Sequence, residues 1–271
     1  MLKLSKLNFL KINFVDKISF YLKFAGFSFV TIFLIFLKTF LQFFSKRISE
    51  KIVQIFHKLL LWLTNINVEV IGQKNIYNVP TLYISNHLSY LDIPILGSKL
   101  IGRFVAKNEI SNWPIIGYLS KVGNTIFVNR NLKFLKTNKS IIYDYLCRGD
   151  NIILFPEGTT SDGNRVLKFK SSLLTSVENK NILIQPIVIR YKSINGMPLN
   201  RWLKPIIAWY GDVDFKPHLI NILKLFSIKA QIIFLPALNG RDFANRKDMT
   251  SSLHHAIDSS YSNSLDNNLL D

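Results

Sequence analysis

The sequence predicts an α/β domain in which a mixed, largely parallel sheet is flanked by helices, preceded by an N-terminal hydrophobic helical membrane anchor. Three observations lead to this fold class. Short β-branched or aromatic runs alternate with helical stretches, which is the pattern of βαβ units. An apolar segment long enough to cross a bilayer lies near the N-terminus. The 271 residues, 48% of them apolar, suffice for one large domain plus an appendage.

We expect three parts along the chain. Residues 1–65 form basic and hydrophobic membrane-anchoring helices, residues 66–240 form the α/β domain, and residues 241–271 form a partly disordered tail that frays after Ser259. The net charge of +17, from 34 basic and 17 acidic side chains, favours an anionic partner. Much of this charge lies beside the hydrophobic segment, and the sequence has no nucleic-acid-binding motif. The expected partner is therefore an anionic membrane surface and not nucleic acid.

The hydrophobic segment covers residues 24–44, and Lys38 is its only charged residue. Basic residues flank it on both sides, so the one-sided excess that orients a spanning helix is missing. This favours an interfacial or half-inserted helix with both ends at the anionic cytoplasmic surface. A spanning helix and a core helix of a soluble domain remain alternatives. An amphipathic helix is expected at residues 49–63.

The elements of the domain then follow in order. Strands are expected at residues 68–71, 81–85, 103–106, 125–128, 151–155, 182–189, 206–210 and 231–235. Helices are expected at residues 91–101, 115–121, 132–147, 170–178 and 218–225. Ligands of such a fold gather at the carboxyl ends of strands. The chemically capable residues that follow strands are His87, Lys107, Arg130 and Glu157.

His87 and Asp92 stand five residues apart in "NHLSYLD", at the expected entrance of a helix. A carboxylate bonded to one ring nitrogen can hold a histidine in the tautomer that removes a proton from a hydroxyl. The alternative is structural: Asn86 or Ser89 caps the helix and Asp92 complements its dipole. The chain has no G-x-S-x-G nucleophile motif, so a base here would activate a hydroxyl of the substrate.

Two further stretches support a site. "GNTIFVNR" ends a strand at Arg130, and "LFPEGTTSDG" continues a strand into Glu157, Gly158 and Thr159. A glycine turn with small hydroxyl residues can offer backbone N–H groups to an anion, and Arg130 and Lys107 add positive charge. An ordinary tight turn is the alternative for the second stretch. The remaining histidines are scattered, so no metal is expected, and the single Cys147 is expected to be a small buried apolar residue.

In this order and spacing, the three stretches resemble the glycerolipid acyltransferase family, in particular bacterial 1-acyl-sn-glycerol-3-phosphate acyltransferases. "NHLSYLD", "GNTIFVNR" and "FPEGT" are similar to its first three motifs, and "IQPIVIRY" is similar to the fourth. "FVAKNEI", which contains Lys107, resembles the basic stretch between the first two motifs. The resemblance covers about residues 81–211.

This resemblance implies one-step acyl transfer at the cytoplasmic face of the bacterial inner membrane. His87, oriented by Asp92, would take the proton of the sn-2 hydroxyl of a lysophospholipid, which attacks an acyl thioester. The donor would be acyl-CoA or acyl carrier protein, a co-substrate and possible partner, and no cofactor would be bound permanently. The residues assigned to acceptor binding are Lys107, Arg130, Glu157, Gly158 and Thr159.

Two departures weaken the expected recognition of phosphate. The third motif commonly continues with arginine where this chain has Thr160, and Asn129 stands where the second motif often has aspartate. The basic residues of "GNRVLKFK" are possible substitutes. A branch of the family that acts on lyso-ornithine lipids, which have no phosphate, is therefore the alternative. Two alternatives belong to other classes of protein. One is a hydrolase in which His87 and Asp92 activate water, and the other is a non-enzymatic basic protein.

Overall fold

The computed structural model describes residues 14–129 and 135–266. The strands in these residues form one mixed sheet in the order β1-β8-β6-β2-β5-β3-β4, with β7 and β9 paired to β6. Their bounds are β1 Ile66–Ile71, β2 Thr81–Ser85, β3 Arg103–Lys107, β4 Ile126–Val128, β5 Ile152–Leu154, β6 Leu183–Ile194, β7 Met197–Pro198, β8 Ile228–Phe234 and β9 Leu238–Asn239. The main path is parallel except where β6 meets β8. The predicted fold class is confirmed.

The centre of the sheet is buried on both faces. Every residue of β2 and β5 is buried, and both strands read as nearly continuous apolar runs, as strands covered on two sides require. β2 pairs with β5 on one side and with β6 on the other. The residues that follow β2 and β5 are therefore neighbours at one edge of the sheet, although about 70 residues separate them in sequence.

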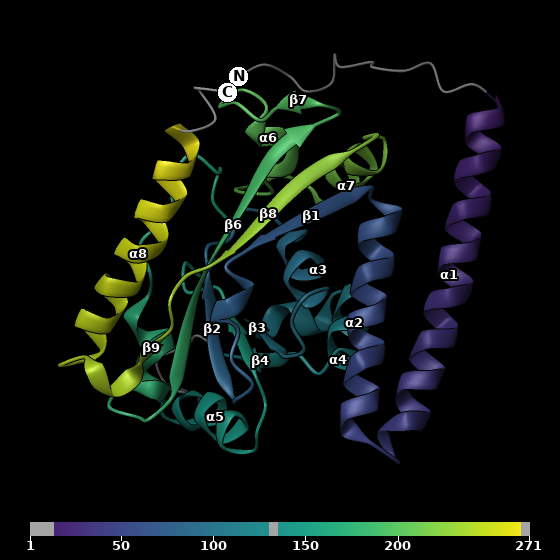
Figure 1. Ribbon diagram of the computed structural model, residues 1–271. Helices are drawn as coiled ribbons and strands as arrows, with labels where there is room; N and C mark the ends of the chain where they lie inside the picture. The colour runs from purple at the N-terminus through teal and green to yellow at the C-terminus, as the bar shows by residue number, and fades with distance from the viewer. Residues whose placement is uncertain (1–13, 130–134, 267–271) are drawn as a thin grey trace.

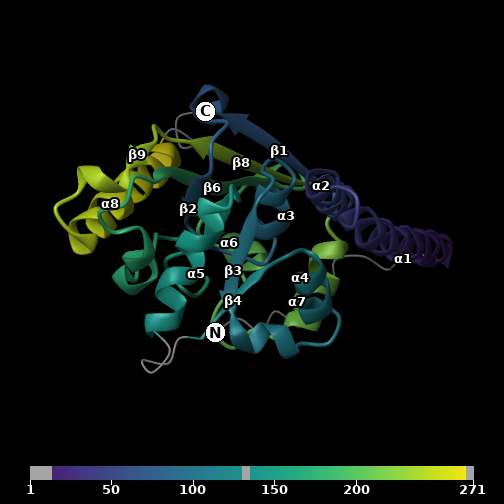
Figure 2. The ribbon, with the colours of Figure 1, turned by 90° about the horizontal axis from the view of Figure 1, so that it is seen from below.

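Helices cover both faces, as Figures 1 and 2 show. Their bounds are α1 Phe14–Gln42, α2 Lys46–Leu63, α3 Asp92–Gly97, α4 Ile116–Val122, α5 Leu135–Cys147, α6 Lys204–Ile207, α7 Phe215–Leu223 and α8 Arg246–Asp266. Short 3-10 helices lie at η2 Gln73–Asn75, η3 Asn108–Asn112, η5 Ser171–Val177 and η6 Gly240–Asp242. α5 and α8 lie on one side of the sheet and α2 and α3 on the other.

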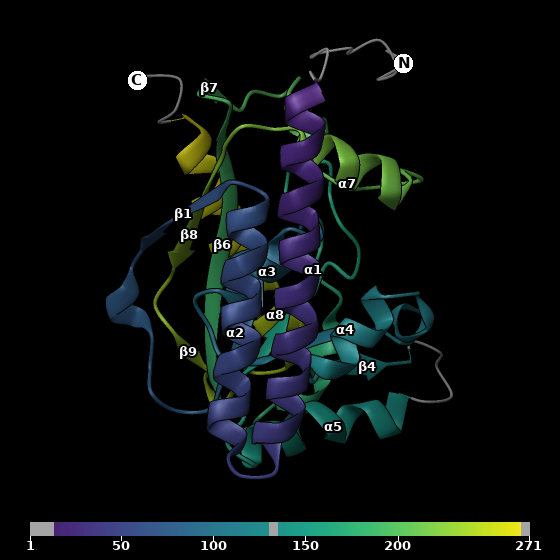
Figure 3. The same ribbon diagram turned by 90° about the vertical axis from the view of Figure 1, so that its right-hand side faces the viewer.

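α1 and α2 form a helical hairpin along the side of the domain (Figure 3). Ser45 caps α2, because its hydroxyl accepts a bond from the backbone N–H of Ile48. The single charge of the hydrophobic segment, Lys38, is turned inward, and its Nζ donates to Oδ1 of Asn124 at 3.3 Å and to Oε1 of Gln42 at 2.6 Å. Residues 25–42 form the one helix, among the described residues, that is apolar and long enough to cross a membrane.

Five expectations were wrong or only partly right. Residues 206–210 are not a strand, because Pro205 lies in the first turn of α6 and Ile207 packs into the core from that helix. Cys147 is exposed at the end of α5. The chain does not fray after Ser259 but continues as α8 to Asp266, with Met249, Leu253, Ile257 and Tyr261 buried at four-residue spacing. The helix expected at 91–101 is only α3, and that expected at 170–178 is the 3-10 helix η5.

Candidate active site

The loop that follows β2 is fixed to β6 by the side chain of Asn86. Its Nδ2 donates to the carbonyl of Ile189 at 2.8 Å, and its Oδ1 accepts from the backbone N–H of Ile189 at 2.8 Å. The backbone pairing of β2 with β6 ends at Ser85. The carboxamide of Asn86 therefore extends this pairing by one step while the main chain turns out of the sheet. Because Asn86 is buried, both ends of the amide need these partners.

The main chain of His87 is held from both sides by the third motif. Its backbone N–H donates to Oε1 of Glu157 at 2.7 Å, and its carbonyl accepts from the N–H of Ser161 at 2.8 Å. Its ring stacks on Phe155, with the ring centroids 4.0 Å apart and the planes tilted by 12°. These contacts fix the position of His87 before any substrate binds, as an electrostatically preorganised site requires.

The predicted contact between His87 and Asp92 is present. Nδ1 of His87 lies 2.8 Å from Oδ2 of Asp92, which is completely buried. The same oxygen accepts the backbone N–H groups of Leu88 at 2.7 Å and Ser89 at 3.0 Å. Asp92 is also the first residue of α3. The one carboxylate oxygen therefore both orients the histidine ring and organises the entrance of the helix. Ser89 does not cap the helix through its hydroxyl, which has no partner among the described residues.

The other ring nitrogen of His87, Nε2, makes no hydrogen bond within the described part of the chain, and 17% of the side chain is exposed. If Asp92 accepts a proton from Nδ1, Nε2 has the lone pair that a general base needs. The tautomer follows from this bonding pattern. The ring is thus arranged to take a proton from a group that approaches from outside the core.

Glu157 lies between two loops and is buried. One carboxylate oxygen accepts the N–H of His87, and the other accepts the N–H of Leu167 at 2.9 Å. Burial raises the pKa of Glu157 to about 8, although these two backbone bonds lower it. These two bonds tie the loop after β2 to the segment around Leu167.

Three of the other predicted binding residues, Gly158, Thr159 and Lys107, lie in the described part of the chain, at or after the ends of strands β5 and β3. Gly158 follows Glu157 with φ at +73°, a conformation that favours glycine, and Thr159 after it is exposed. Lys107 is exposed at the carboxyl end of β3, next to Val128 of β4. Arg130 lies outside the described residues. Gly158, Thr159 and Lys107 therefore lie at the carboxyl ends of neighbouring strands, β5 and β3.

Thr160, which stands where arginine is common, has an internal partner. Its hydroxyl donates to the carbonyl of Trp209, and the backbone N–H of Trp209 donates to the carbonyl of Leu88 at 3.0 Å. The segment around Trp209 thus ties the first and third motifs together. The sequence reading missed this link, because it assigned residues 206–210 to a strand.

Aromatic rings gather beside this link. The rings of Tyr90, Trp113, Trp209 and Phe215 pack mostly edge to face, with centroids 4.9–6.4 Å apart. The hydroxyl of Tyr90 lies 3.0 Å from Nδ1 of His218. Tyr90 belongs to the "NHLSYLD" loop, so this aromatic cluster adjoins the loop that carries His87 and Asp92.

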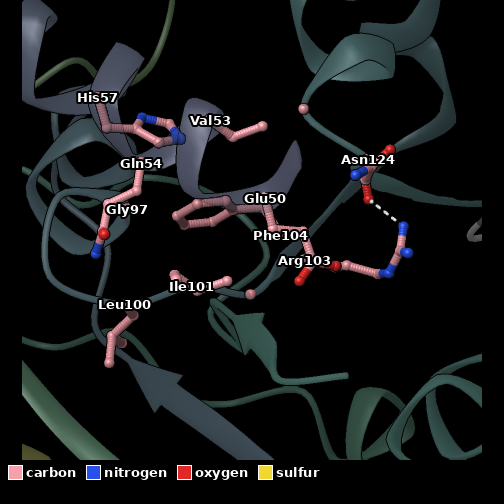
Figure 4. Close-up of a pocket in the computed structure, with 12 residues that line it drawn as sticks. Glu50, Val53, Gln54, His57, Gly97, Leu100, Ile101, Arg103, Phe104 and Asn124 are labelled. Atoms are coloured by element: carbon pink, nitrogen blue, oxygen red, sulfur yellow. Dashed lines mark hydrogen bonds between the residues drawn. The ribbon is translucent and has the colours of Figure 1, made fainter. Parts of the chain in front are cut away.

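A cavity lies away from these residues, between α2 and the start of β3 (Figure 4). Glu50, Gln54 and His57 of α2 line it together with Phe104 and Arg103. Burial lowers the pKa of His57 to about 4, so the ring is neutral and packs as an aromatic group 5.9 Å from Phe104. No residue of the predicted site lines this cavity, which belongs to the seam between the hairpin and the sheet.

A mixed α/β sheet that carries an Asn-His-x4-Asp loop at its carboxyl edge, clamped by a Pro-Glu-Gly turn, defines an enzyme of the acyltransferase class. Comparison with known proteins agrees. The family model described as "Acyltransferase" matches residues 67–190. A lyso-ornithine lipid O-acyltransferase of Rhizobium meliloti is 35% identical over 211 residues, which cover 74% of this chain and 71% of that protein. This chain belongs to the acyltransferase family.

Two other similarities are informative. A 1-acyl-sn-glycerol-3-phosphate acyltransferase of Neisseria gonorrhoeae is 27% identical over 65% of this chain and 67% of its own length. The crystal structure of PlsC, the 1-acyl-sn-glycerophosphate acyltransferase of Thermotoga maritima, matches with a TM-score of 0.62 and 22% identity, covering 91% of this chain and 96% of PlsC. The latter likeness concerns the fold, including the helices that precede the sheet.

Proposed function

We propose that this enzyme transfers an acyl group from a thioester to the free hydroxyl of a lysolipid at a membrane surface. The contact between His87 and Asp92 supports this most directly. A fixed base without a serine or cysteine nucleophile beside it suits the activation of a hydroxyl that the substrate brings. We propose acyl transfer, as expected from the sequence, with His87 as the base and Asp92 as the residue that orients it.

The chemical step is a direct transfer. Nε2 of His87 takes the proton of the acceptor hydroxyl while its oxygen attacks the thioester carbonyl. The C–S bond then breaks, and the departing thiolate receives the proton from the imidazolium. Asp92 stabilises the imidazolium in between. Backbone N–H groups near Gly158 are candidates for stabilising the oxyanion. Acyl-CoA and acyl carrier protein both present such a thioester, and the residues do not favour one over the other.

The acceptor that we propose is lyso-ornithine lipid rather than the sn-2 hydroxyl of lysophosphatidic acid. The relative with 35% identity carries that activity in its name, whereas the glycerol-phosphate relative is 27% identical. Thr160 replaces a cationic phosphate ligand by a hydroxyl that is already bonded to Trp209. An ornithine head group, which has no phosphate, loses nothing by this replacement. We therefore prefer lyso-ornithine lipid, the alternative acceptor from the sequence, over lysophosphatidic acid, the acceptor first expected.

We propose that α1 attaches the enzyme to an anionic membrane surface from the cytoplasmic side. Its outer face exposes large apolar side chains at helical spacing: Phe29, Ile32, Phe33, Phe36 and Phe40. Lys38 is buried and bonds Asn124, so the helix keeps a polar contact with the domain on its inner face. A helix of this kind suits an interfacial position, with its apolar face among acyl chains, better than a fully spanning one.

The acceptor is tested with the full-length protein in mixed vesicles. Acyl-CoA and acyl carrier protein thioesters are supplied separately, each with lyso-ornithine lipid, lysophosphatidic acid or buffer, and products are identified by mass. Acylated ornithine lipid at a rate at least tenfold above phosphatidic acid is the expected result. Preferred formation of phosphatidic acid would reverse the choice of acceptor. Free fatty acid without consumption of either lysolipid would favour the hydrolase instead.

A further inference from the structure

Asp92 has a second side-chain partner that comes from a distant part of the chain. The hydroxyl of Tyr191 donates to Oδ1 of Asp92 at 2.7 Å, across 99 residues of sequence. Tyr191 is 5% exposed and belongs to β6. The two oxygens of Asp92 therefore have separate duties: Oδ1 faces Tyr191, and Oδ2 faces His87 and two backbone N–H groups.

The backbone of β6 is irregular at this residue. The register of β6 against β8 shifts between Tyr191 and Ser193, as a β-bulge does. Bulges redirect side chains and are frequent beside active sites. Two residues earlier, Ile189 is bonded by the amide of Asn86. One strand thus holds the catalytic loop at both ends, through Asn86 before His87 and through Tyr191 at Asp92.

We infer that Tyr191 is a positioning residue for acyl transfer, because its hydroxyl fixes the Asp92 carboxylate in the rotation that presents Oδ2 to His87. This inference rests on the proposed function of His87. Without the hydroxyl, Oδ1 would be a buried charged oxygen with no partner, which is costly. The carboxylate would rotate to share the remaining donors, and the bond to Nδ1 would lengthen.

The hydroxyl is suited to this task at every physiological pH. Burial raises the pKa of Tyr191 well above its usual range, and the neighbouring Asp92 charge raises it further. Tyr191 therefore remains a proton donor to the carboxylate. Tyr83, which is 1% exposed in β2, is a matched comparison, because it is an equally buried tyrosine whose hydroxyl does not bond Asp92.

The test compares Tyr191→Phe with Tyr83→Phe in the full-length enzyme. Loss of one hydrogen bond to a charged group predicts a fall in kcat of about tenfold or more for Tyr191→Phe, with KM for the lysolipid within about twofold of wild type. Tyr83→Phe should retain kcat. In the background of Asp92→Ala, where no carboxylate remains to be held, Tyr191→Phe should change the residual rate by less than about twofold.

A second measurement does not depend on turnover. The proton on Nδ1 of His87 should give a downfield NMR resonance because it is bonded to a buried carboxylate, and this resonance should shift in Tyr191→Phe but not in Tyr83→Phe. An unchanged resonance and kcat, or an equal loss of rate with and without Asp92, would overturn the inference. A wild-type enzyme that acylates no lysolipid would instead contradict the proposed function, and the resonance would still report on Tyr191.

Discussion

Oδ2 of Asp92 lies 2.8 Å from Nδ1 of His87, and the two backbone N–H groups that follow His87 bond the same oxygen. The carboxylate therefore binds the ring and the turn that carries the ring as one unit. Four residues between the two side chains are just enough for the turn to fold back onto the first residue of α3. This explains why an x4 spacing, which is unfavourable within one helix, works at a helix entrance.

Replacement of Asp92 by asparagine should impair turnover. An amide cannot accept at both ends, so either the bond from Tyr191 at Oδ1 is lost, or the bonds from Nδ1 of His87 and the loop N–H groups at Oδ2 are lost. In either case the imidazolium loses its counter-charge. We expect kcat to fall by about a hundredfold or more, measured with a radiolabelled acyl donor. The matched control is Asp144→Asn, at an exposed position of α5. Equal kcat for Asp92→Asn and wild type would exclude the orienting role.

The pH dependence of stability should carry a signature of Glu157. Its pKa is raised to about 8 by burial, so the folded state binds a proton that the unfolded state releases near its ordinary value of 4.5. The stabilising contribution of this proton is complete below about pH 4.5 and is lost as the pH rises towards 8. Urea unfolding from pH 5 to 9 should show this decline.

Glu157→Gln should flatten that decline, because glutamine does not titrate. Glu109→Gln makes the same substitution at an exposed position of η3 and should leave the decline intact. If the free energy of unfolding of Glu157→Gln follows the wild-type pH profile, the protonation of Glu157 is not its cause. Because glutamine places an N–H₂ group against one backbone N–H, a loss of activity of about tenfold is also expected from the displaced loop.

Packing of the hairpin against the sheet should depend on Gly97. A Cβ at this position would lie 2.5 Å from Cδ2 of His57, whose ring is enclosed by its neighbours in the seam (Figure 4). Gly97→Ala should therefore destabilise the protein by about 1–3 kcal/mol, the usual cost of overpacking. Combining it with His57→Ala should restore part of this loss, measured by urea unfolding of both single variants and the double variant. Strict additivity would contradict the contact.

The elements that could be predicted were those with a local signal. The strands around "ISNHLSYLD" and "LFPEGTTSDG" were found because their apolar runs are continuous and their turns are rich in glycine and asparagine. The contact of His87 with Asp92 followed from the spacing of a single turn. α8 was missed, although Met249, Leu253, Ile257 and Tyr261 repeat every four residues; its many serines and asparagines obscured this signal.

The remaining parts of the site depend on strand pairing, which has no local signature. Tyr191 reaches Asp92 because β6 adjoins β2, and Glu157 reaches the backbone of His87 because β5 adjoins β2. The resemblance assigns Glu157 to acceptor binding, where it would fix basic groups or an acceptor hydroxyl, and this stays a prediction. The backbone N–H partners of Glu157 were not predicted. The sequences of β5 and β6 do not indicate that these strands pair with β2, so these partners become visible only in the folded sheet.

The membrane proposal predicts that charges on the exposed face of α1 weaken membrane binding. Phe36→Glu and Phe40→Glu each remove an exposed apolar side chain and add a charge that an anionic surface repels. Each should weaken binding to vesicles of anionic lipid by about tenfold, measured by sedimentation with the folded protein. Val79→Glu, at another exposed apolar position outside α1, should leave vesicle binding unchanged. Equal losses for all three variants would point to nonspecific repulsion.

The central claim, that His87 is the base of lysolipid acylation, is tested most directly by His87→Ala. Initial rates of acylated lipid formation are measured by mass for the wild type and the variant, at equal amounts of vesicle-bound enzyme with lyso-ornithine lipid as acceptor. The account predicts a fall on the order of a thousandfold or more, with vesicle binding and unfolding midpoint close to wild type. A variant that keeps more than about a tenth of the wild-type rate, well above what loss of a general base allows, would contradict it.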